Sequence, residues 1–447
     1  MSWSSRFVAD ALELPAGPAV EFSEISSDTR TLHPGALFVA LVGEHFDGHD
    51  HLRRALDAGA TGAMVRKGTP PVPGLIFFEV DDTLHGYGRL ARARRRQING
   101  PVVAVTGSNG KTSTKEMVAA VLRTRYAVHA TRLNLNNLVG IPQTILAAPP
   151  ETTALVIEAG ANIPGEIARA REIIEPSVAI ITNVGDSHLE GFGTRNGVML
   201  EKLALLSGVP LAVVGTDPPD LGRQARGRAR RVLTAGLKDS DVVPSSLTVD
   251  GSGRPSFTID GVDVRLPIRG QHQAANAMLA WALVRELGLD RKAAAAALSS
   301  LALPGGRGEV VEVGGLTIVN DAYNANPASF RTAIATAQAM RQGRRLVFIA
   351  GSMRELGKDS KRFHHEIAGE LAALNPEVLG VVGDFVAAIK PHTQVLGQRL
   401  LQASDPMALG PLLKERLQGN ELVVLKASRG VQLERILPFL GINIEAH

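Results

Sequence analysis

PVVAVTGSNGKTSTKEMVAAVL, from Pro101 to Leu122, is the most informative stretch of this sequence. Val102 to Val105 form an apolar, β-branched run typical of a buried strand, and Lys111-Thr112 open a segment with helical apolar spacing. A turn of small residues, Gly107-Ser108-Asn109-Gly110, joins the two. This combination binds phosphate, because backbone N–H groups and the positive end of the helix dipole point at the anion. Lys111 would contact the terminal phosphates and the Thr112 hydroxyl would bind Mg²⁺, so the stretch predicts a nucleotide site.

The alternative is a Gly-Lys pair in an ordinary turn between a strand and a helix. Order, spacing and flanking residues all favour nucleotide binding instead. One position departs from the standard spacing, which needs glycine at position 105 where this chain has Val105. The shorter form, TGSNGKT, resembles the ATP-dependent Mur ligases and the related folylpolyglutamate synthases. Both families form amide bonds through an acyl phosphate, so the resemblance implies ATP and Mg²⁺ as cofactors.

Length and composition narrow the class of protein. A chain of 447 residues with 45% hydrophobic and 21% charged residues is typical of a globular protein of two to four domains. The absence of cysteine excludes disulfides, thiolate catalysis and cysteine-bound zinc. A net charge of +4 and 4% aromatic residues argue against nucleic-acid binding. We find neither a signal peptide nor an apolar run of membrane-spanning length, and expect a cytoplasmic enzyme.

A basic cluster, Arg92, Arg94, Arg95 and Arg96, precedes the nucleotide stretch. It could contact RNA or a phosphate. We favour the solvated end of a helix before a domain boundary, because charge runs usually lie in water.

The alternation of strands and helices predicts an α/β protein with three domains. Residues 1–98 read as a small N-terminal α/β domain, residues 99–303 as a central domain with a mostly parallel sheet around the phosphate loop, and residues 304–447 as a Rossmann-like C-terminal domain. Hinges near 99 and 304 would let the domains close over the site and exclude water.

The N-terminal domain contains a polar turn with His45, His49 and His51 beside Asp47 and Asp50. A metal site is conceivable there, but Asp47-Gly48-His49 also suits loop and cap chemistry, which we favour. The segment SSDTRTLHPGALFVALVGEHFDGHDHL resembles the uridine-diphosphate-binding domain of the Mur ligases. The resemblance implies that a uridine diphosphate lies near a set of substrate-binding residues, namely Thr29, Arg30, Asp47, Gly48 and His49.

An asparagine-rich segment, Asn134-Leu135-Asn136-Asn137, follows the phosphate helix. Such a run suits neither a strand nor a helix interior. It is either a turn that satisfies its own backbone or a loop that presents amides to a sugar or peptide. The Mur ligases carry an asparagine-rich loop here that faces the muramoyl-peptide, so the resemblance implies substrate contacts for Asn134 and Asn137. Arg132-Leu133 replace the glycine that is usual before the first asparagine.

Two candidate metal ligands follow successive apolar strands of the chain. Glu158 ends the strand 153–158, and His188 comes shortly after the strand 178–182. Ligand sites of open α/β sheets lie at the carboxyl ends of parallel strands. A glutamate there is either a Mg²⁺ ligand or a paired structural acid, and a lone histidine is more often structural. The shared sheet edge favours metal binding by both, and their segments resemble the metal-binding segments of the family.

Lys202, in the segment GVMLEKL, would by itself read as a surface lysine paired with an acid. The family places a lysine about this far beyond the metal-binding histidine, and CO₂ carbamylates its amine. The resemblance therefore implies that Lys202 becomes an oxygen donor for Mg²⁺. Leu203 stands where the family usually has glycine.

Four positions outside the phosphate loop complete the predicted nucleotide site. Asn276 is either a buried capping amide or, as the resemblance implies, a neighbour of adenine. Arg307 matches an arginine that the family directs at the nucleotide. Asp321 can bind a ribose hydroxyl, and Tyr323 can stack on adenine. The full predicted ATP-binding set is Gly107, Ser108, Asn109, Gly110, Lys111, Thr112, Ser113, Asn276, Arg307, Asp321 and Tyr323.

NDAYNANPAS, residues 320–329, and GSMRELG, residues 351–357, indicate a branch of the family. Both resemble segments of the Mur ligase that adds D-alanyl-D-alanine. The implied substrates are UDP-N-acetylmuramoyl-tripeptide and D-alanyl-D-alanine, with Lys111, Glu158, His188 and Lys202 in catalysis. We expect no nucleic-acid partner and a monomer. The rival interpretations are a sister Mur ligase, a folylpolyglutamate synthase, and a binding module or ATP-dependent switch that senses a muramoyl ligand.

Overall fold

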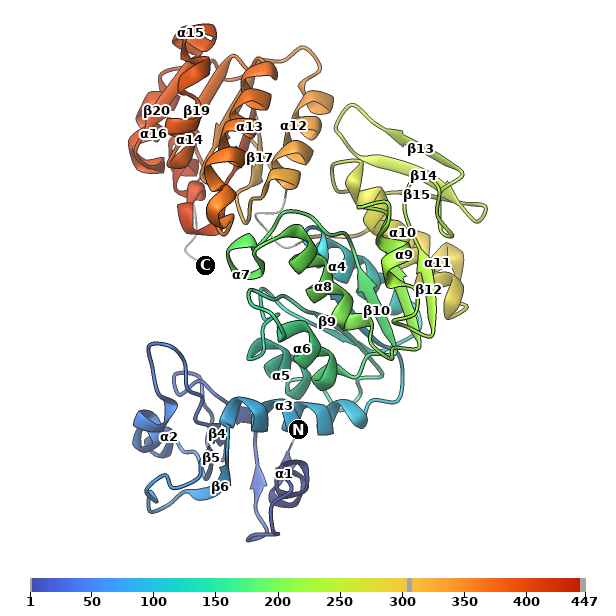
Figure 1. The fold of residues 1–447 in the computed structure, drawn as a ribbon, viewed down its shortest axis with the longest axis vertical. Helices are drawn as coiled ribbons and strands as arrows, with labels where there is room; N and C mark the ends of the chain where they lie inside the picture. Colours follow the sequence, from blue (N-terminus) through green and yellow to red (C-terminus); the bar gives the residue numbers. More distant parts are fainter. Residues whose placement is uncertain (1, 304–307, 443–447) are drawn as a thin grey trace.

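The computed structural model describes residues 2–303 and 308–442. N-terminal, central and C-terminal α/β units follow one another along the long axis of the molecule (Figure 1). Parallel strand pairs dominate the main sheet of each unit. The predicted α/β class with mostly parallel sheets is confirmed, and the exact domain limits 1–98, 99–303 and 304–447 stay a prediction.

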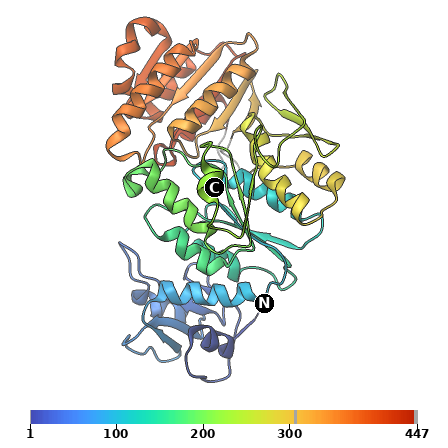
Figure 2. The ribbon, with the colours of Figure 1, turned by 45° about the vertical axis from the view of Figure 1, so that its right-hand side comes forward.

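The N-terminal unit combines a parallel sheet with a short antiparallel pair. The parallel sheet has the order β3 (Ile25–Ser26), β4 (Leu37–Val39), β5 (Gly62–Arg66) and β6 (Ile76–Val80), and the pair is β1 (Trp3–Ser4) with β2 (Glu21–Phe22). The helical segments are α1 (Ser5–Leu12), η1 (Gly48–His51), α2 (Leu52–Asp57) and α3 (Thr83–Arg96). Figures 1 and 2 show α3 lying between this unit and the central one.

The central unit is built on a parallel sheet buried on both faces. In sheet order its strands are β12 (Arg231–Thr234), β11 (Leu211–Val214), β10 (Val178–Ile181), β7 (Val102–Thr106), β9 (Ala154–Glu158) and β8 (Val128–Ala130). Its helical segments are α4 (Lys111–Leu122), α5 (Gly140–Leu146), α6 (Glu166–Ile174), α7 (Leu189–Phe192), α8 (Arg195–Leu203), η2 (Ala204–Leu206), α9 (Leu221–Ala225), α10 (His272–Glu286) and α11 (Arg291–Ser299). Val103 and Val105 belong to the core that includes α4 and α10, whereas Val102 and Ala104 belong to the core that includes α5 and α6. This two-sided burial explains why β7 reads as a continuous apolar run.

An antiparallel sheet extends the central unit beside α10 and α11. It contains β13 (Ser246–Val249), β14 (Pro255–Ile259) and β15 (Val262–Arg265). Phe257, Ile259 and Val264 pack into the same core as Trp281 of α10.

The C-terminal unit has a mixed sheet covered on both faces. In sheet order its strands are β16 (Glu309–Val313), β17 (Leu316–Asp321), β21 (Leu422–Lys426), β18 (Leu346–Ala350), β19 (Val378–Val382) and β20 (Leu400–Ala403). Its helical segments are α12 (Pro327–Arg341), η3 (Gly357–Asp359), α13 (Ser360–Ala373), α14 (Asp384–Ala388), η4 (Lys390–His392), α15 (Thr393–Leu396), η5 (Gly397–Arg399), α16 (Pro406–Lys414), η6 (Arg429–Val431) and η7 (Leu433–Leu440). Only the β16–β17 pair is antiparallel among the described strands of this sheet. The carboxyl ends of β17 and β21 face the central unit and carry site residues.

The arginine cluster at the end of α3 confirms only part of our expectation of a solvated helix end. Arg94 is buried and donates to the backbone oxygens of Ala148 and Pro149. Arg95 donates to the backbone oxygens of Ile174 and Glu175. The more exposed Arg92 and Arg96 both pair with the Glu175 carboxylate. The cluster therefore joins the N-terminal unit to the central one, because carbonyls and a carboxylate of the central unit accept its hydrogen bonds.

Candidate active site

The predicted phosphate loop lies where β7 ends and α4 begins, and two glycines set its shape. At Gly107, with φ +149°, a Cβ would lie 1.9 Å from Thr182 Oγ1. Gly110 is the N-cap of α4 with φ 76°, in the left-handed region that favours glycine. The backbone N–H of Asn109 donates to Asn183 Oδ1 at 2.9 Å, and Ser108 Oγ accepts from the Gly185 N–H at 2.9 Å. The loop is therefore held against the segment that follows β10, with the N-terminus of α4 behind it.

Lys111 and Thr112 begin α4 with different contacts. Lys111 Nζ donates to the backbone oxygens of Gly107 at 2.8 Å and Ser108 at 3.4 Å, so its side chain curls over the loop. The buried Thr112 hydroxyl donates to Glu158 Oε2 at 2.7 Å. Ser113 is also buried and lines the cavity described below. A hydroxyl and a carboxylate oxygen thus meet directly behind the phosphate loop.

Glu158 ends β9, and each of its two carboxylate oxygens accepts a hydrogen bond. The residue is 2% exposed, and its Oε1 accepts from Asn136 Nδ2 at 2.8 Å. Its backbone N–H donates to Thr131 Oγ1 at 3.0 Å, and Thr131 O in turn accepts from the buried Lys115 Nζ at 2.6 Å. The position of Glu158 is consequently fixed from both the phosphate helix and the asparagine-rich loop.

His188 lies at the N-terminus of α7 and faces the C-terminal unit. Its Nδ1 is 2.5 Å from Oε2 of Glu355, and its side chain is 17% exposed. The ring meets Phe192 edge-on at a centroid distance of 6.5 Å. The contact with His188 lowers the pKa of the Glu355 carboxyl, so this carboxylate stays ionised near neutral pH.

Lys202, near the end of α8, is completely buried rather than at the surface. Its Nζ has no hydrogen-bond partner among the described residues, and it lies 5.8 Å from the centroid of the Phe192 ring. Burial, followed by the charge of Lys111, lowers the pKa of the Lys202 amine to about 7. The alternative of a surface lysine paired with an acid is therefore wrong, and an unsatisfied amine stands in the interior.

These donors suit Mg²⁺ bound together with nucleotide phosphates. Mg²⁺ usually takes one or two carboxylates and completes its shell with water and phosphate oxygens. Glu158 and the adjoining Thr112 hydroxyl supply hard oxygen donors. Lys202 is a buried amine without a hydrogen-bond partner among the described residues, and it is not one of the residues that line the cavity described below. In residues 2–303 and 308–442 no cluster of three or more His, Cys, Asp or Glu side chains could hold a metal by itself. That result also gives no support to a metal site at His45, His49 and His51.

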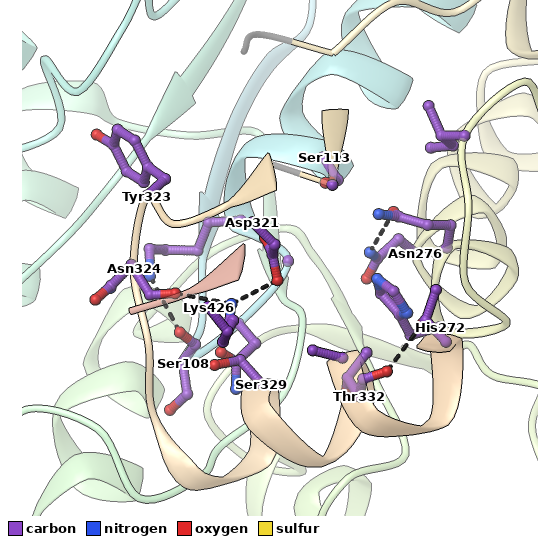
Figure 3. Close-up of a pocket in the computed structure, with 18 of the residues that line it drawn as sticks. Ser108, Ser113, His272, Asn276, Asp321, Tyr323, Asn324, Ser329, Thr332 and Lys426 are labelled. Atoms are coloured by element: carbon purple, nitrogen blue, oxygen red, sulfur yellow. Dashed lines mark hydrogen bonds and ion pairs between the residues drawn. The ribbon is translucent and has the colours of Figure 1, made fainter. Parts of the chain in front are cut away.

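A cavity of about 460 Å³ lies between the central and C-terminal units. Its predicted lining residues include Ser108, Asn109, Gly110, Lys111, Ser113, Asn134, Asn137, Glu158, His188, Asn276, Asp321 and Tyr323. Figure 3 shows His272 and Asn276 on one side and Asp321, Tyr323 and Lys426 on the other. The structure thus brings predicted phosphate, metal and nucleoside residues from two units to one cavity. Arg307 lies outside the described residues.

Asn276 and Asp321 each have a partner inside this cavity. Asn276 is buried in α10, and its Nδ2 donates to Gln273 Oε1 at 3.1 Å. A Cβ at Gly110 would be 2.7 Å from Asn276 Oδ1, so this amide lies against the phosphate loop. Asp321 Oδ2 is 2.6 Å from Nζ of Lys426, which also donates to Asn324 O at 2.8 Å. His272 of α10 lines the same cavity.

The asparagine-rich loop contacts both its own backbone and the cavity. Asn137 Oδ1 accepts from the N–H groups of Val139 and Gly140 and so caps α5. Asn134 is exposed at the cavity. Leu133 adopts φ 52° in the left-handed region, where the family usually has glycine. The loop combines the two alternatives from the sequence, because Asn137 bonds the local backbone and both Asn134 and Asn137 line the cavity.

The predicted uridine-diphosphate residues lie in the N-terminal unit and are not among the residues that line this cavity. Arg30 binds the Asp28 carboxylate at 2.7 Å and lowers its pKa to about 2, and Thr29 lies between them in sequence. Asp47 caps η1 through the His49 N–H, while His49 Nε2 accepts from the Arg66 N–H at 2.9 Å. Gly48 is buried beside the Leu41 backbone. The Asp47-Gly48-His49 turn therefore acts as a helix cap, which is the alternative that the sequence favours.

Sequence reasoning missed several residues at the site. Asn136 binds Glu158, Lys426 binds Asp321, and Glu355 contacts His188. Asn326 Nδ2 donates to Asn109 Oδ1 at 2.8 Å and links α12 to the phosphate loop. Each of these residues lies in a segment that stands out in the sequence. Its partner, however, is brought to it by the fold, and the two residues of a pair can be up to 217 residues apart in sequence.

Comparisons with known proteins agree with this geometry. Residues 105–284 match the Mur ligase middle domain, and residues 306–429 match the Mur ligase glutamate ligase domain. A Bacillus subtilis protein named UDP-N-acetylmuramoyl-tripeptide–D-alanyl-D-alanine ligase is 35% identical over 429 residues, which cover 92% of each chain. The structure resembles MurF from Acinetobacter baumannii with a TM-score of 0.88 and 28% identity, covering 98% of this chain and 99% of that one. It also resembles Thermotoga maritima MurF in complex with ADP, with a TM-score of 0.82 and 31% identity, covering 93% and 96% of the two chains.

The prediction of a ligase from the D-alanyl-D-alanine-adding branch is confirmed by these relatives, and nucleotide use is confirmed with it. No helix in the described parts of the chain has the length and apolar character needed to cross a membrane. Family matches over both larger units, together with relatives that align over nearly the whole length, leave one assignment. The chain belongs to the Mur ligase family of ATP-dependent ligases.

Proposed function

We propose that this chain joins D-alanyl-D-alanine to UDP-N-acetylmuramoyl-tripeptide through an acyl phosphate, in cytoplasmic peptidoglycan precursor synthesis. The observation that carries the proposal is the shared cavity, where the phosphate loop and Glu158 of the central unit meet Asp321 and Tyr323 of the C-terminal unit. A ligase needs this arrangement, because ATP and a carboxylate have to meet before an amine attacks. We propose that the active chain is a monomer.

The reaction has two balanced steps. A carboxylate oxygen of the tripeptide attacks the γ-phosphorus of ATP, and ADP leaves as the acyl phosphate forms. The amine of D-alanyl-D-alanine then attacks the acyl carbon, phosphate leaves with the C–O bond pair, and the amine loses a proton. Phosphoryl transfer requires chiefly positioning and charge neutralisation. Lys111 provides a cation at the phosphate loop for the first step.

We assign ATP binding to two groups of residues. Gly107, Ser108, Asn109, Gly110, Lys111, Thr112 and Ser113 surround the phosphates, and Asn276, Asp321 and Tyr323 contact the nucleoside, with Arg307 assigned from the sequence alone. Asp321 can accept from a ribose hydroxyl while it remains paired with Lys426. Thr29, Arg30, Asp47, Gly48 and His49 bind the uridine diphosphate, and Asn134 and Asn137 contact the muramoyl-peptide.

Thr112, Glu158, His188 and a carbamylated Lys202 would hold Mg²⁺, which neutralises charge on the transferring phosphoryl group. Carbamylation joins the neutral Lys202 amine to CO₂ and releases one proton, which turns a buried amine into a carboxylate-like anion. The absence of a partner for Nζ and its complete burial support this modification. Glu201, the preceding residue, is already occupied by the N–H groups of Gly165 and Ile167.

A phosphate-release assay with a panel of UDP-muramoyl-peptides tests the proposed specificity. We expect release only when ATP, UDP-muramoyl-tripeptide and D-alanyl-D-alanine are all present. A matched reaction with UDP-muramoyl-dipeptide and a single amino acid controls for sister-ligase activity, and its robust turnover would refute the assignment. ATP hydrolysis that a muramoyl ligand stimulates without any amide product would instead indicate a switch.

A further inference from the structure

The central and C-terminal units meet closely at α7 and the turn that precedes η3. The Glu190 N–H donates to the Glu355 backbone oxygen at 3.2 Å. Gly357 adopts φ +54°, and a Cβ there would lie 3.3 Å from Glu190 Cα. Glycine therefore allows the two backbones to approach at this point.

Two left-handed residues other than glycine face each other across this junction. His188 has φ 52° and Glu355 has φ 64°. Such backbone is unfavourable for these residues, and where it persists it often serves a functional site. Here it accompanies the 2.5 Å contact between His188 Nδ1 and Glu355 Oε2.

The His188 ring is held from two directions. Glu355 contacts Nδ1 from the C-terminal unit, while Phe192 of the same helix meets the ring edge-on at 6.5 Å. Phe192 also contacts the buried Lys202, whose Nζ is 5.8 Å from the phenyl centroid. The Nδ1–Oε2 pair is an ion-pair contact whose angles do not meet hydrogen-bond geometry. Nε2 is the ring nitrogen without this carboxylate contact, and it is the one left for a metal ion.

We propose that Glu355 is a positioning residue that holds His188 so that its Nε2 binds Mg²⁺. Metal-binding histidines commonly donate their other ring N–H to a carboxylate, which fixes the tautomer and ring orientation. In this chain the carboxylate comes from a different unit than the histidine. Contact between the central and C-terminal units is thereby coupled to the metal site, and the inference rests on the proposed metal role of His188.

Metal binding to the whole protein tests this role without any turnover. Mn²⁺ replaces Mg²⁺, a non-hydrolysable ATP analogue fills the nucleotide site, and electron paramagnetic resonance measures free Mn²⁺. We expect Glu355→Gln to raise the Mn²⁺ dissociation constant about 10–100-fold, the usual effect of losing such a partner. Glu355→Asp, which keeps the charge but shortens the reach, should weaken binding as well. The Glu355 side chain is 51% exposed, so neither change should prevent folding.

Glu190→Gln is the matched control, because it removes an exposed negative charge at the same junction and keeps the backbone contact. It should leave the Mn²⁺ dissociation constant unchanged. In a His188→Ala background, Glu355→Gln should not change the Mn²⁺ dissociation constant any further, because Glu355 acts through the imidazole ring of His188. If His188→Ala weakens binding and Glu355→Gln does not, or strengthens it, the role of Glu355 is overturned while the proposed function stands. If His188→Ala itself leaves binding unchanged, the metal assignment of the proposed function fails.

Discussion

Lys202→Ala is expected to lower the ligation rate by about 10²-fold or more, the scale of a lost electrostatic stabiliser, and formate should restore part of the activity. A buried ammonium without a partner would be costly, whereas a carbamate would face Mg²⁺ as an oxygen ligand. The Lys202 amine is completely buried, makes no hydrogen bond among the described residues, and has its pKa lowered to about 7 by burial. Formate can occupy the space that the alanine variant opens and replace the missing anion. The measurement is steady-state phosphate release with and without formate.

Two control variants make this test specific. Lys202→Met fills much of the buried volume, so formate should not rescue it. Lys292→Ala removes an exposed lysine of α11 and should retain full activity. Wild-type activity of Lys202→Ala without formate would leave no catalytic role for this amine.

Lys111→Ala should reduce kcat roughly 10²–10³-fold, the scale of a lost electrostatic donor. Its ammonium lies over the phosphate loop, where it bonds the backbone oxygens of Gly107 and Ser108. Transfer of the γ-phosphoryl group develops negative charge beside this ammonium in the transition state. Most of the lost activity should therefore appear as a lower kcat rather than as a higher KM. Initial rates over a range of ATP concentrations measure this division.

Lys361→Ala, which changes an exposed lysine of α13, is the control for removing a positive charge and should behave as wild type. Lys111→Met keeps most of the side-chain stem and should fail like Lys111→Ala. Near-normal turnover of either Lys111 variant would contradict the phosphate-loop assignment.

Features set by local sequence could be predicted. The glycines of the phosphate loop, the apolar run of β7 and the helical spacing of α4 lie within 22 consecutive residues, so their arrangement follows from backbone preference and periodicity. Glu158 and His188 were placed near one sheet edge because β9 and β10 are both read as parallel-type strands, and both residues line the cavity.

Features set by tertiary packing could not be predicted. The arginines at the end of α3 look like a solvated charge run until Ala148, Pro149 and Glu175 are brought against them by folding. Lys202 shows no sign of burial in its own segment, since only the fold places its side chain in the interior. The pairing of Asp321 with Lys426 depends on two strands, β17 and β21, that are neighbours in the sheet but distant in sequence.

Oxygen-isotope transfer tests the central claim of an acyl phosphate most directly. UDP-muramoyl-tripeptide is labelled with ¹⁸O in both oxygens of its reacting carboxylate and allowed to react with ATP and D-alanyl-D-alanine. Mass spectrometry then measures the ¹⁸O content of each product. An acyl phosphate predicts one ¹⁸O in the released phosphate and one retained in the new amide carbonyl, with ADP as the nucleotide product. Unlabelled phosphate beside a formed amide, or AMP carrying the label, would contradict the account.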